Sequence, residues 1–514
     1  MGKRSRAAIA SIVLALVLVG LAYAGFGATK TASVFLSGLT LAALYFLLAA
    51  GLSLIFGLMD VLNFAHGTLF MIGAYAGYST FGNPRLLLNT LPLFLTLLAG
   101  GMVGAVAGRP LRAWERTVRR RRAGEGQDEG GRQGLPAILV RLPPSLILAL
   151  LAVGVLLWGV RGFPLGRLVA FEATATGGAI PTAEAQEPLS RMLLRLVLMA
   201  LAGLLAGPAL VRGRERRGVW GEVALAVGIA LAGLLLLLAR DPLEGFLLGL
   251  SVDLRFLLAL IAGAAVGGLL GALMERTLIR PFYGNPITQI VLTLGLMFVG
   301  TELVKAVWGR EGHPPMTVPS LFAESCRSET FLAWLTEHCS SIGVLGRAFP
   351  TYRLFIIFVG GVILVGVGLL LQYSRLGMII RAGVQDSEMV EALGINVRRV
   401  FTLVFGLGSA LAALGGVVAA PFVGVYPEMG GIFQLQAFIA VVIGGMGSYA
   451  GTAVGALLLG LARAFGDALV TSGIALPWAE QALRASPAVA RASTVLIMAI
   501  VLLVRPAGIF GRKE

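Results

Sequence analysis

Long apolar stretches, broken by short polar segments, run through the whole chain. Most are close to the length of about 20 residues that crosses a hydrocarbon core about 30 Å thick. They do not alternate with period two, so the pattern predicts helices and not the strands of a barrel. We predict about fourteen crossings, at 8–27, 33–57, 64–80, 91–108, 144–160, 192–211, 219–239, 255–274, 287–308, 354–372, 400–425, 432–446, 452–470 and 492–504. Two short runs, 64–80 and 432–446, are also compatible with half-helices or re-entrant segments.

Composition supports a membrane protein. Of the 514 residues, 57% are hydrophobic and 13% are charged, whereas a soluble domain carries roughly 25% charged residues. Only helices and closed barrels pair every backbone polar group in lipid, so the fold class is an all-α polytopic integral membrane protein. We expect the first run to be a retained helix and not a signal peptide, because it lacks a convincing small-residue cleavage site.

The basic residues give the orientation. The net charge is +15, but these residues lie between apolar runs, so no nucleic-acid partner is expected. If the N-terminus is cytoplasmic, alternating crossings place nearly every basic cluster on that side, as the positive-inside rule requires. The clusters lie at 3–6, 109–141, 212–217, 276–280, 375–399 and 505–513. The sequence therefore predicts an even number of crossings, both termini in the cytoplasm, and membrane lipids as partners.

A short polar break between the second and third apolar runs contains Asp60, Asn63 and His66. Polar groups at membrane depth are costly and often mark a solute pathway, so these three residues are candidates for the translocation path. Alternatively, Asp60 or Asn63 caps a helix that begins near Phe64. Both roles are compatible, because a helix N-terminus inside a membrane can face a polar solute.

The most polar stretch in the second half, 373–398, predicts a short helix between two long apolar runs. Asp386 is a good N-cap, Glu388 favours the first turn, and Gly394 is a good terminator. An apolar stripe on this helix suggests that it docks on another surface. A plain connecting loop is the alternative. The stripe consists of Met389, Val390 and Leu393.

The longest outward loop, 309–352, contains both cysteines of the chain, Cys326 and Cys339. In an oxidising periplasm they could form a disulfide. Two free thiols are an equally open alternative, and the few histidines and cysteines predict no metal site.

Five stretches together resemble the membrane permeases of the high-affinity branched-chain amino acid ABC importers, a type that also serves urea and short amides. They occur in the family's order and span most of 32–80 and 255–512. The stretches are GLMDVLNFAHGTLFMIGAY, MERTLIRPFYGNPITQIVLTLGLMF, YSRLGMIIRAGVQDSEMVEALGINVRRVF, AVVIGGMGSYAGTAVGALLLG and VRPAGIFGR.

The resemblance implies an ABC importer permease bundle in the inner membrane. A periplasmic solute-binding protein would deliver the cargo, a second permease subunit would complete the path as a heterodimer, and two cytoplasmic ABC ATPase subunits would hydrolyse ATP. The segment Arg381–Ile395 would be the coupling helix that contacts an ATPase. Its candidate coupling residues are Arg381, Asp386, Glu388, Glu391 and Gly394.

No catalytic residue, cofactor or metal is expected in this chain. A Walker A loop needs Gly-Lys-Ser/Thr, and none of the four lysines lies in that sequence. A stand-alone secondary transporter is a different class that remains open. Its intramembrane charges would be Glu302 and Lys305, which could instead simply pair at i, i+3. A membrane-embedded enzyme is disfavoured, because no nucleophile and base occur together.

The chain is longer than members of this family usually are. The excess falls at 92–254, which predicts an inserted membrane region with four crossings and a basic cytoplasmic loop at 109–141. The permease core would then consist of 1–91 and 255–514.

Overall fold

The computed structural model describes residues 28–124, 143–163, 171–173, 179–181, 187–210, 219–385, 387–471, 473 and parts of 486–510. The chain divides into two compact units. Unit 1 comprises Met1–Phe81 and Ser251–Glu514, and unit 2 comprises Gly82–Leu250.

The predicted helices are present. Twelve of the fourteen runs coincide with helices, and nine helices of the described residues are long and apolar enough to cross a membrane. Two more, Pro144–Val160 and Met429–Gly444, are apolar but shorter. The total of fourteen stays a prediction, because 8–27 and much of 492–504 lie outside the described residues.

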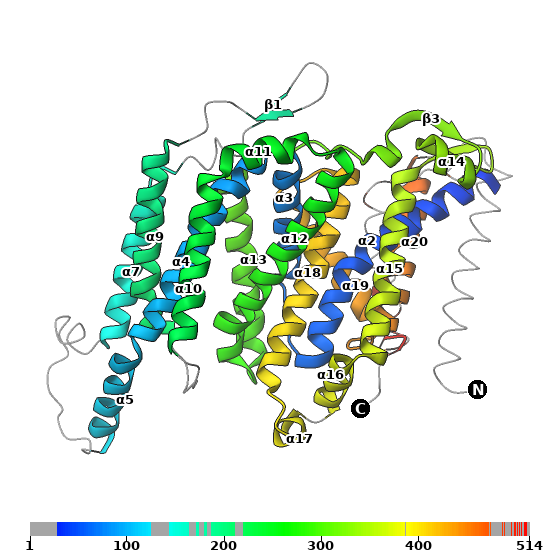
Figure 1. Cartoon of the computed structure of the whole chain (residues 1–514). Coiled ribbons are helices and arrows are strands. Elements are labelled where there is room, and N and C mark those ends of the chain that lie inside the picture. Colours follow the sequence, from blue (N-terminus) through cyan, green and yellow to red (C-terminus); the bar gives the residue numbers. More distant parts are fainter. Residues whose placement is uncertain are drawn as a thin grey trace. The chain divides into compact units, whose positions relative to one another are not determined.

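Unit 1 is a bundle in which α18 packs against α2 and α12, and α20 packs against α2 and α19 (Figure 1). A short helix pair, α16 and α17, lies at one end of this bundle. Its long helices are α2 (Ala28–Met59), α3 (His66–Gly82), α12 (Val252–Met274), α13 (Pro286–Trp308), α15 (Thr351–Tyr373), α18 (Val397–Val423), α19 (Met429–Gly444) and α20 (Tyr449–Thr471). The short ones are α16 (Arg375–Gln385) and α17 (Ser387–Ala392).

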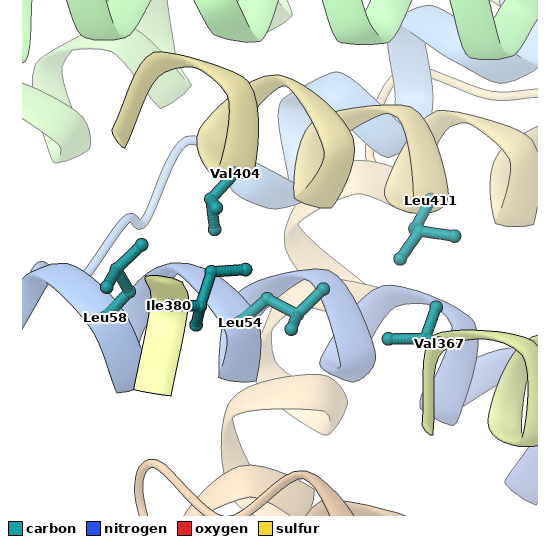
Figure 2. Close-up of a cluster of buried hydrophobic side chains, with 6 residues drawn as sticks. All are labelled: Leu54, Leu58, Val367, Ile380, Val404 and Leu411. Carbon is teal, nitrogen blue, oxygen red and sulfur yellow. The ribbon is translucent and has the colours of Figure 1, made fainter. Parts of the chain in front are cut away.

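Glycines allow the backbones of these helices to touch. A Cβ atom added to Gly416 of α18 would overlap the carbonyl oxygen of Phe70 in α3, and one added to Gly455 of α20 would overlap that of Ala440 in α19. Such contact matters in lipid, where apolar burial gives helices little reason to associate and dispersion at close range must hold them together. A cluster of buried side chains fills the space that remains between α2, α15, α16 and α18 (Figure 2).

A small folded lobe replaces the loop expected between α13 and α15. It consists of β3 (Glu324–Ser328), α14 (Phe331–Glu337), β4 (Cys339–Val344) and β5 (Arg347–Pro350). Strand β4 lies in the middle, parallel to β3 and antiparallel to β5. Cys326 and Cys339 are joined by a disulfide that ties β3 to the start of β4. This disulfide lobe lies at the opposite end of the bundle from α16 and α17 (Figure 1).

In unit 2, α4 packs against α9 and α10, and α7 packs against α9. Arg195 and Glu187 form a nearly buried, bidentate ion pair, and both of its N···O distances are 2.7 Å. The elements of unit 2 are α4 (Pro84–Ala107), α5 (Arg109–Gly124), α7 (Pro144–Val160), α9 (Leu189–Leu210), α10 (Val219–Leu238), α11 (Arg240–Gly249), and the antiparallel strands β1 (Phe171–Ala173) and β2 (Ala179–Pro181).

The prediction of a loop over 109–141 was wrong for its first part. Residues 109–124 form helix α5, whereas the rest of the range lies outside the described residues. Arginine is among the better helix formers, and Glu115 ties the helix to α7 by accepting hydrogen bonds from the N–H and hydroxyl of Ser145, at 2.7 and 3.0 Å.

The glycine contacts predict a contrast between two substitutions. Gly416→Ala should destabilise unit 1 by about 1–3 kcal/mol, because the methyl group forces α18 away from α3. Gly361→Ala in α15 is the matched control. No atom lies within 4 Å of its added Cβ, so it should be neutral or stabilising by up to about 1 kcal/mol. Thermal unfolding of the detergent-purified protein measures both. Equal shifts would contradict the contact.

Candidate translocation site

An open cavity of about 1150 Å³ lies in unit 1 beside α16. It brings together segments that are far apart in the sequence: the last turns of α2, the start of α13, the junction of α15 with α16, and the loop between α19 and α20. Both polar and apolar side chains line it. Lining residues from these segments include Ser53, Asp60, Tyr283, Gln289, Gln372, Arg381, Ser448 and Tyr449.

Asp60 lies at this cavity and ends α2. Its φ is 51°, in the left-handed region, where Asp is tolerated better than most residues, and its N–H donates to the carbonyl of Phe56 at 2.9 Å. Its side chain is exposed. Of the three path candidates, Asp60 is the one whose side chain the fold presents to the cavity.

Asn63 and His66 lie inside the helix packing, not at the cavity. The side-chain oxygen of Asn63 accepts from the N–H of Ala65 at 3.0 Å, just before α3 begins at His66. The carbonyl of Asn63 accepts from the side-chain amide of Gln434 in α19 at 3.3 Å. The imidazole of His66 is fully buried and packs close to Gly51 of α2. Asn63 therefore supports the chain turn into α3 and links it to α19.

The predicted docking helix is α17, and it is shorter than expected. It ends at Ala392. Gly394, the predicted terminator, lies in the turn that follows, with a φ of 82° and an N–H that donates to the carbonyl of Glu391 at 3.0 Å. Val390 is buried, whereas Met389 and Leu393 are 60% and 72% exposed. The exposed pair leaves an apolar surface on α17 and the turn that follows it.

The remaining coupling candidates fall in different places. Arg381 lines the cavity and donates to the carbonyl of Gln372 at 3.3 Å. Glu391 is exposed. Asp386 lies outside the described residues, and for Glu388 only the backbone within α17 is described.

A buried carboxylate next to the cavity was missed by the sequence reasoning. Glu275 is fully buried and follows α12 in a π-helical turn, Glu275–Ile279. Arg280 donates to both of its oxygens, at 3.0 and 2.9 Å. The hydroxyls of Tyr283 and Thr402 also donate to it, at 2.5 and 2.7 Å. We call these four residues the Glu275 cluster.

The Glu275 cluster joins the end of α12 to the first turns of α18. Thr402 belongs to α18, and Arg280 also donates to the carbonyl of Arg398 in the same helix, at 3.1 Å. Burial and the neighbouring carboxylate raise the pKa of Tyr283 above its usual value, so its hydroxyl keeps its proton at neutral pH. Because α18 directly follows α17, the cluster connects the predicted docking helix to the bundle.

The two charges considered for a stand-alone transporter pair with each other. The ammonium of Lys305 lies 3.0 Å from Glu302, whose side chain is 68% exposed. A solvent-accessible ion pair between residues three apart is most simply explained as one that stabilises helix α13.

Comparison with known proteins identifies the family. The model of the permease component of branched-chain amino acid transport systems matches residues 34–115 and 138–504, most of the chain. This chain belongs to that permease family. It is a multi-pass membrane protein and a permease component of ABC transport.

Named relatives agree with this permease family. The chain is 29% identical to the branched-chain amino acid permease LivH of Escherichia coli over 274 residues, which is 52% of this chain and 79% of LivH. It is 31% identical to BraD of Pseudomonas aeruginosa over 269 residues, 51% of this chain and 77% of BraD. The ribose import permease RbsC of E. coli is 26% identical over 247 residues, 46% of this chain and 69% of RbsC. No solved structure matches the chain.

The burial of Glu275 predicts a large cost for removing its partner. Arg280→Met should destabilise the permease by about 3–5 kcal/mol, because it leaves a buried carboxylate without its cation. Lys305→Met removes a cation from an exposed pair and should cost about 0–1 kcal/mol. Unfolding by denaturant in mixed micelles compares the two. A small effect of Arg280→Met would mean that the cluster does not hold α12 to α18.

Proposed function

We propose that this permease forms half of the translocation path of an ABC importer for branched-chain amino acids. The observation that carries the proposal is the cavity of about 1150 Å³, which has Asp60 and Arg381 in one lining. It thus lies between the end of a spanning helix and the predicted coupling segment. In such a position, movement of the coupling segment changes the shape of the cavity.

The partners follow from the surfaces that unit 1 leaves open. The exposed Met389 of α17 and Leu393 just after this helix would contact a cytoplasmic ATPase subunit, one of two in the complex. The long apolar helices α13 and α15 expose most of their surface, which suits contact with lipid or with the second permease subunit. We place the protein in the inner membrane with both termini in the cytoplasm, where the basic clusters satisfy the positive-inside rule. A periplasmic binding protein would then meet the opposite face.

Coupling would proceed through α17. Closure of the ATPases would displace α17, and α18 would move with it because the two are joined by a short turn at Gly394. The Glu275 cluster would pass the displacement from Thr402 to α12. Rigid helices that tilt in this way convert a small local movement into alternate opening of the two faces.

Branched-chain amino acids are the proposed cargo because LivH and BraD carry that name. The relatives RbsC and the fructose import permease FruF of Bifidobacterium longum make sugars the second candidate, and the resemblance in the sequence adds urea and short amides. The matched segment of 274 residues covers most of LivH but about half of this chain. The family model matches 92–115 and runs through 138–254, so the bounds 92–254 of the proposed insertion stay a prediction.

Uptake by the reconstituted complex tests the proposed function. The permease is co-purified with its ATPase and binding-protein partners, placed in liposomes, and supplied with labelled leucine, ribose or urea. We expect ATP-dependent uptake of leucine that persists when an ionophore collapses ion gradients. Uptake driven by a proton or sodium gradient without ATP would instead identify a secondary transporter.

Glu391→Ala tests the coupling segment itself. Because Glu391 is exposed beside the end of α17, the substitution should leave the permease folded and reduce ATP-driven uptake about tenfold. Asp241→Ala removes an exposed carboxylate from α11 of unit 2 and should leave uptake unchanged. If both variants transport normally, α17 is not the coupling element.

A further inference from the structure

A second cavity of unit 1 lies between α12, α15 and the disulfide lobe and has a volume of about 510 Å³. This is within the range of about 300–1,000 Å³ that is typical of small-molecule sites. Its walls are largely aromatic. Phe322 stacks on Trp334 with ring centroids 5.6 Å apart and lies 5.4 Å from Phe355, so the shape is held by packed rings.

Water is a poor occupant of this cavity. A volume of 510 Å³ is the share of roughly 17 waters, and each would need two to four polar partners. Asp253 and Thr351 of the lining already form hydrogen bonds within the protein. Asp253 accepts hydrogen bonds from the N–H and the hydroxyl of Ser320, and the hydroxyl of Thr351 donates to the carbonyl of Cys339 at 2.8 Å. An apolar guest therefore fits better.

The cavity is continuous with the apolar surface of two spanning helices. Leu257 of α12 and Phe358 of α15 line it and are 51% and 66% exposed. One turn further along the same helices, Ile261 and Val362 are 58% and 50% exposed. In a membrane-spanning protein such a surface contacts hydrocarbon chains, so a lipid chain has direct access to the cavity.

Trp334 places an aromatic ring in the wall of this cavity. Tryptophan is enriched where hydrocarbon meets lipid headgroups. The ring therefore offers an apolar surface to a chain that enters from the membrane.

We propose that this cavity binds one acyl chain of a membrane phospholipid, which packs against the rings of Phe322, Trp334 and Phe355. An amino acid fits less well. Its ammonium and carboxylate need charged partners of both signs, and the lining carries Asp253 but no cation. The site is distinct from the larger cavity beside α16, and its occupancy does not depend on the transport activity.

Native mass spectrometry of the full-length chain in mild detergent tests the site. The wild type should retain one phospholipid mass per chain. Leu260→Phe adds volume to a residue of the lining and should lower the retained lipid at least about fivefold, because the added ring occupies the space of the chain. Leu269→Phe makes the same change on α12 outside the lining, at a residue 66% exposed, and should behave as the wild type. A wild type without retained lipid, or equal retention in Leu260→Phe, would overturn the proposal.

A second measurement decides the question if Leu260→Phe does not fold. The chain is reconstituted into phospholipid brominated near the middle of its acyl chains, and the emission of Trp334 is obtained as the difference between the wild type and Trp334→Phe. A chain inside the cavity brings bromine close to the indole and should quench this emission by more than half. Unquenched Trp334 emission would show that water or protein occupies the cavity.

Discussion

Direct contact between helix backbones is the constraint on which unit 1 depends. Helix α18 lies against three neighbours at once: Gly408 faces Gly51 of α2, Gly416 faces Phe70 of α3, and Gly267 of α12 faces its Ala413. In lipid the helices gain little from apolar burial, so these short distances supply much of the attraction. A helix held in this way on three sides has few ways to move without moving its neighbours.

Because α18 is packed so closely, a movement at its first turns is passed on to the neighbouring helices. The first turns of α18 follow the predicted coupling helix α17, and the Glu275 cluster fixes those turns to α12. The ends of α2 and α15 complete the cavity beside them. A displacement of α17 would therefore move α18 and α12 and, with them, the wall of the cavity. The two ends of unit 1 also differ in chemistry: polar and apolar groups mix in the cavity beside α16, whereas the cavity below the disulfide lobe is apolar.

Much of this architecture was predictable because membrane helices follow directly from length and hydropathy. The terminator at Gly394 was predictable as well, since a positive φ at the end of a helix favours glycine. The Glu275 cluster was not. Glu275 and Arg280 are five residues apart, and an α-helix brings together residues three or four apart. The π-helical turn that aligns them has no clear signature in the sequence. For the same reason of long-range packing, the sequence could not separate Asp60, at the cavity, from Asn63 and His66, within the helix core.

The accessibility of one residue inside the cavity tests most directly whether it is the translocation path. Ser448 lines the cavity and is partly exposed, so a reagent in water that enters the cavity reaches its side chain. In the assembled transporter carrying Ser448→Cys, a membrane-impermeant thiol reagent applied from the side of the ATPases should modify the cysteine in the resting state. Trapping with ATP and vanadate should slow this modification strongly. A rate that is the same in both states, or no modification in either, would contradict the account.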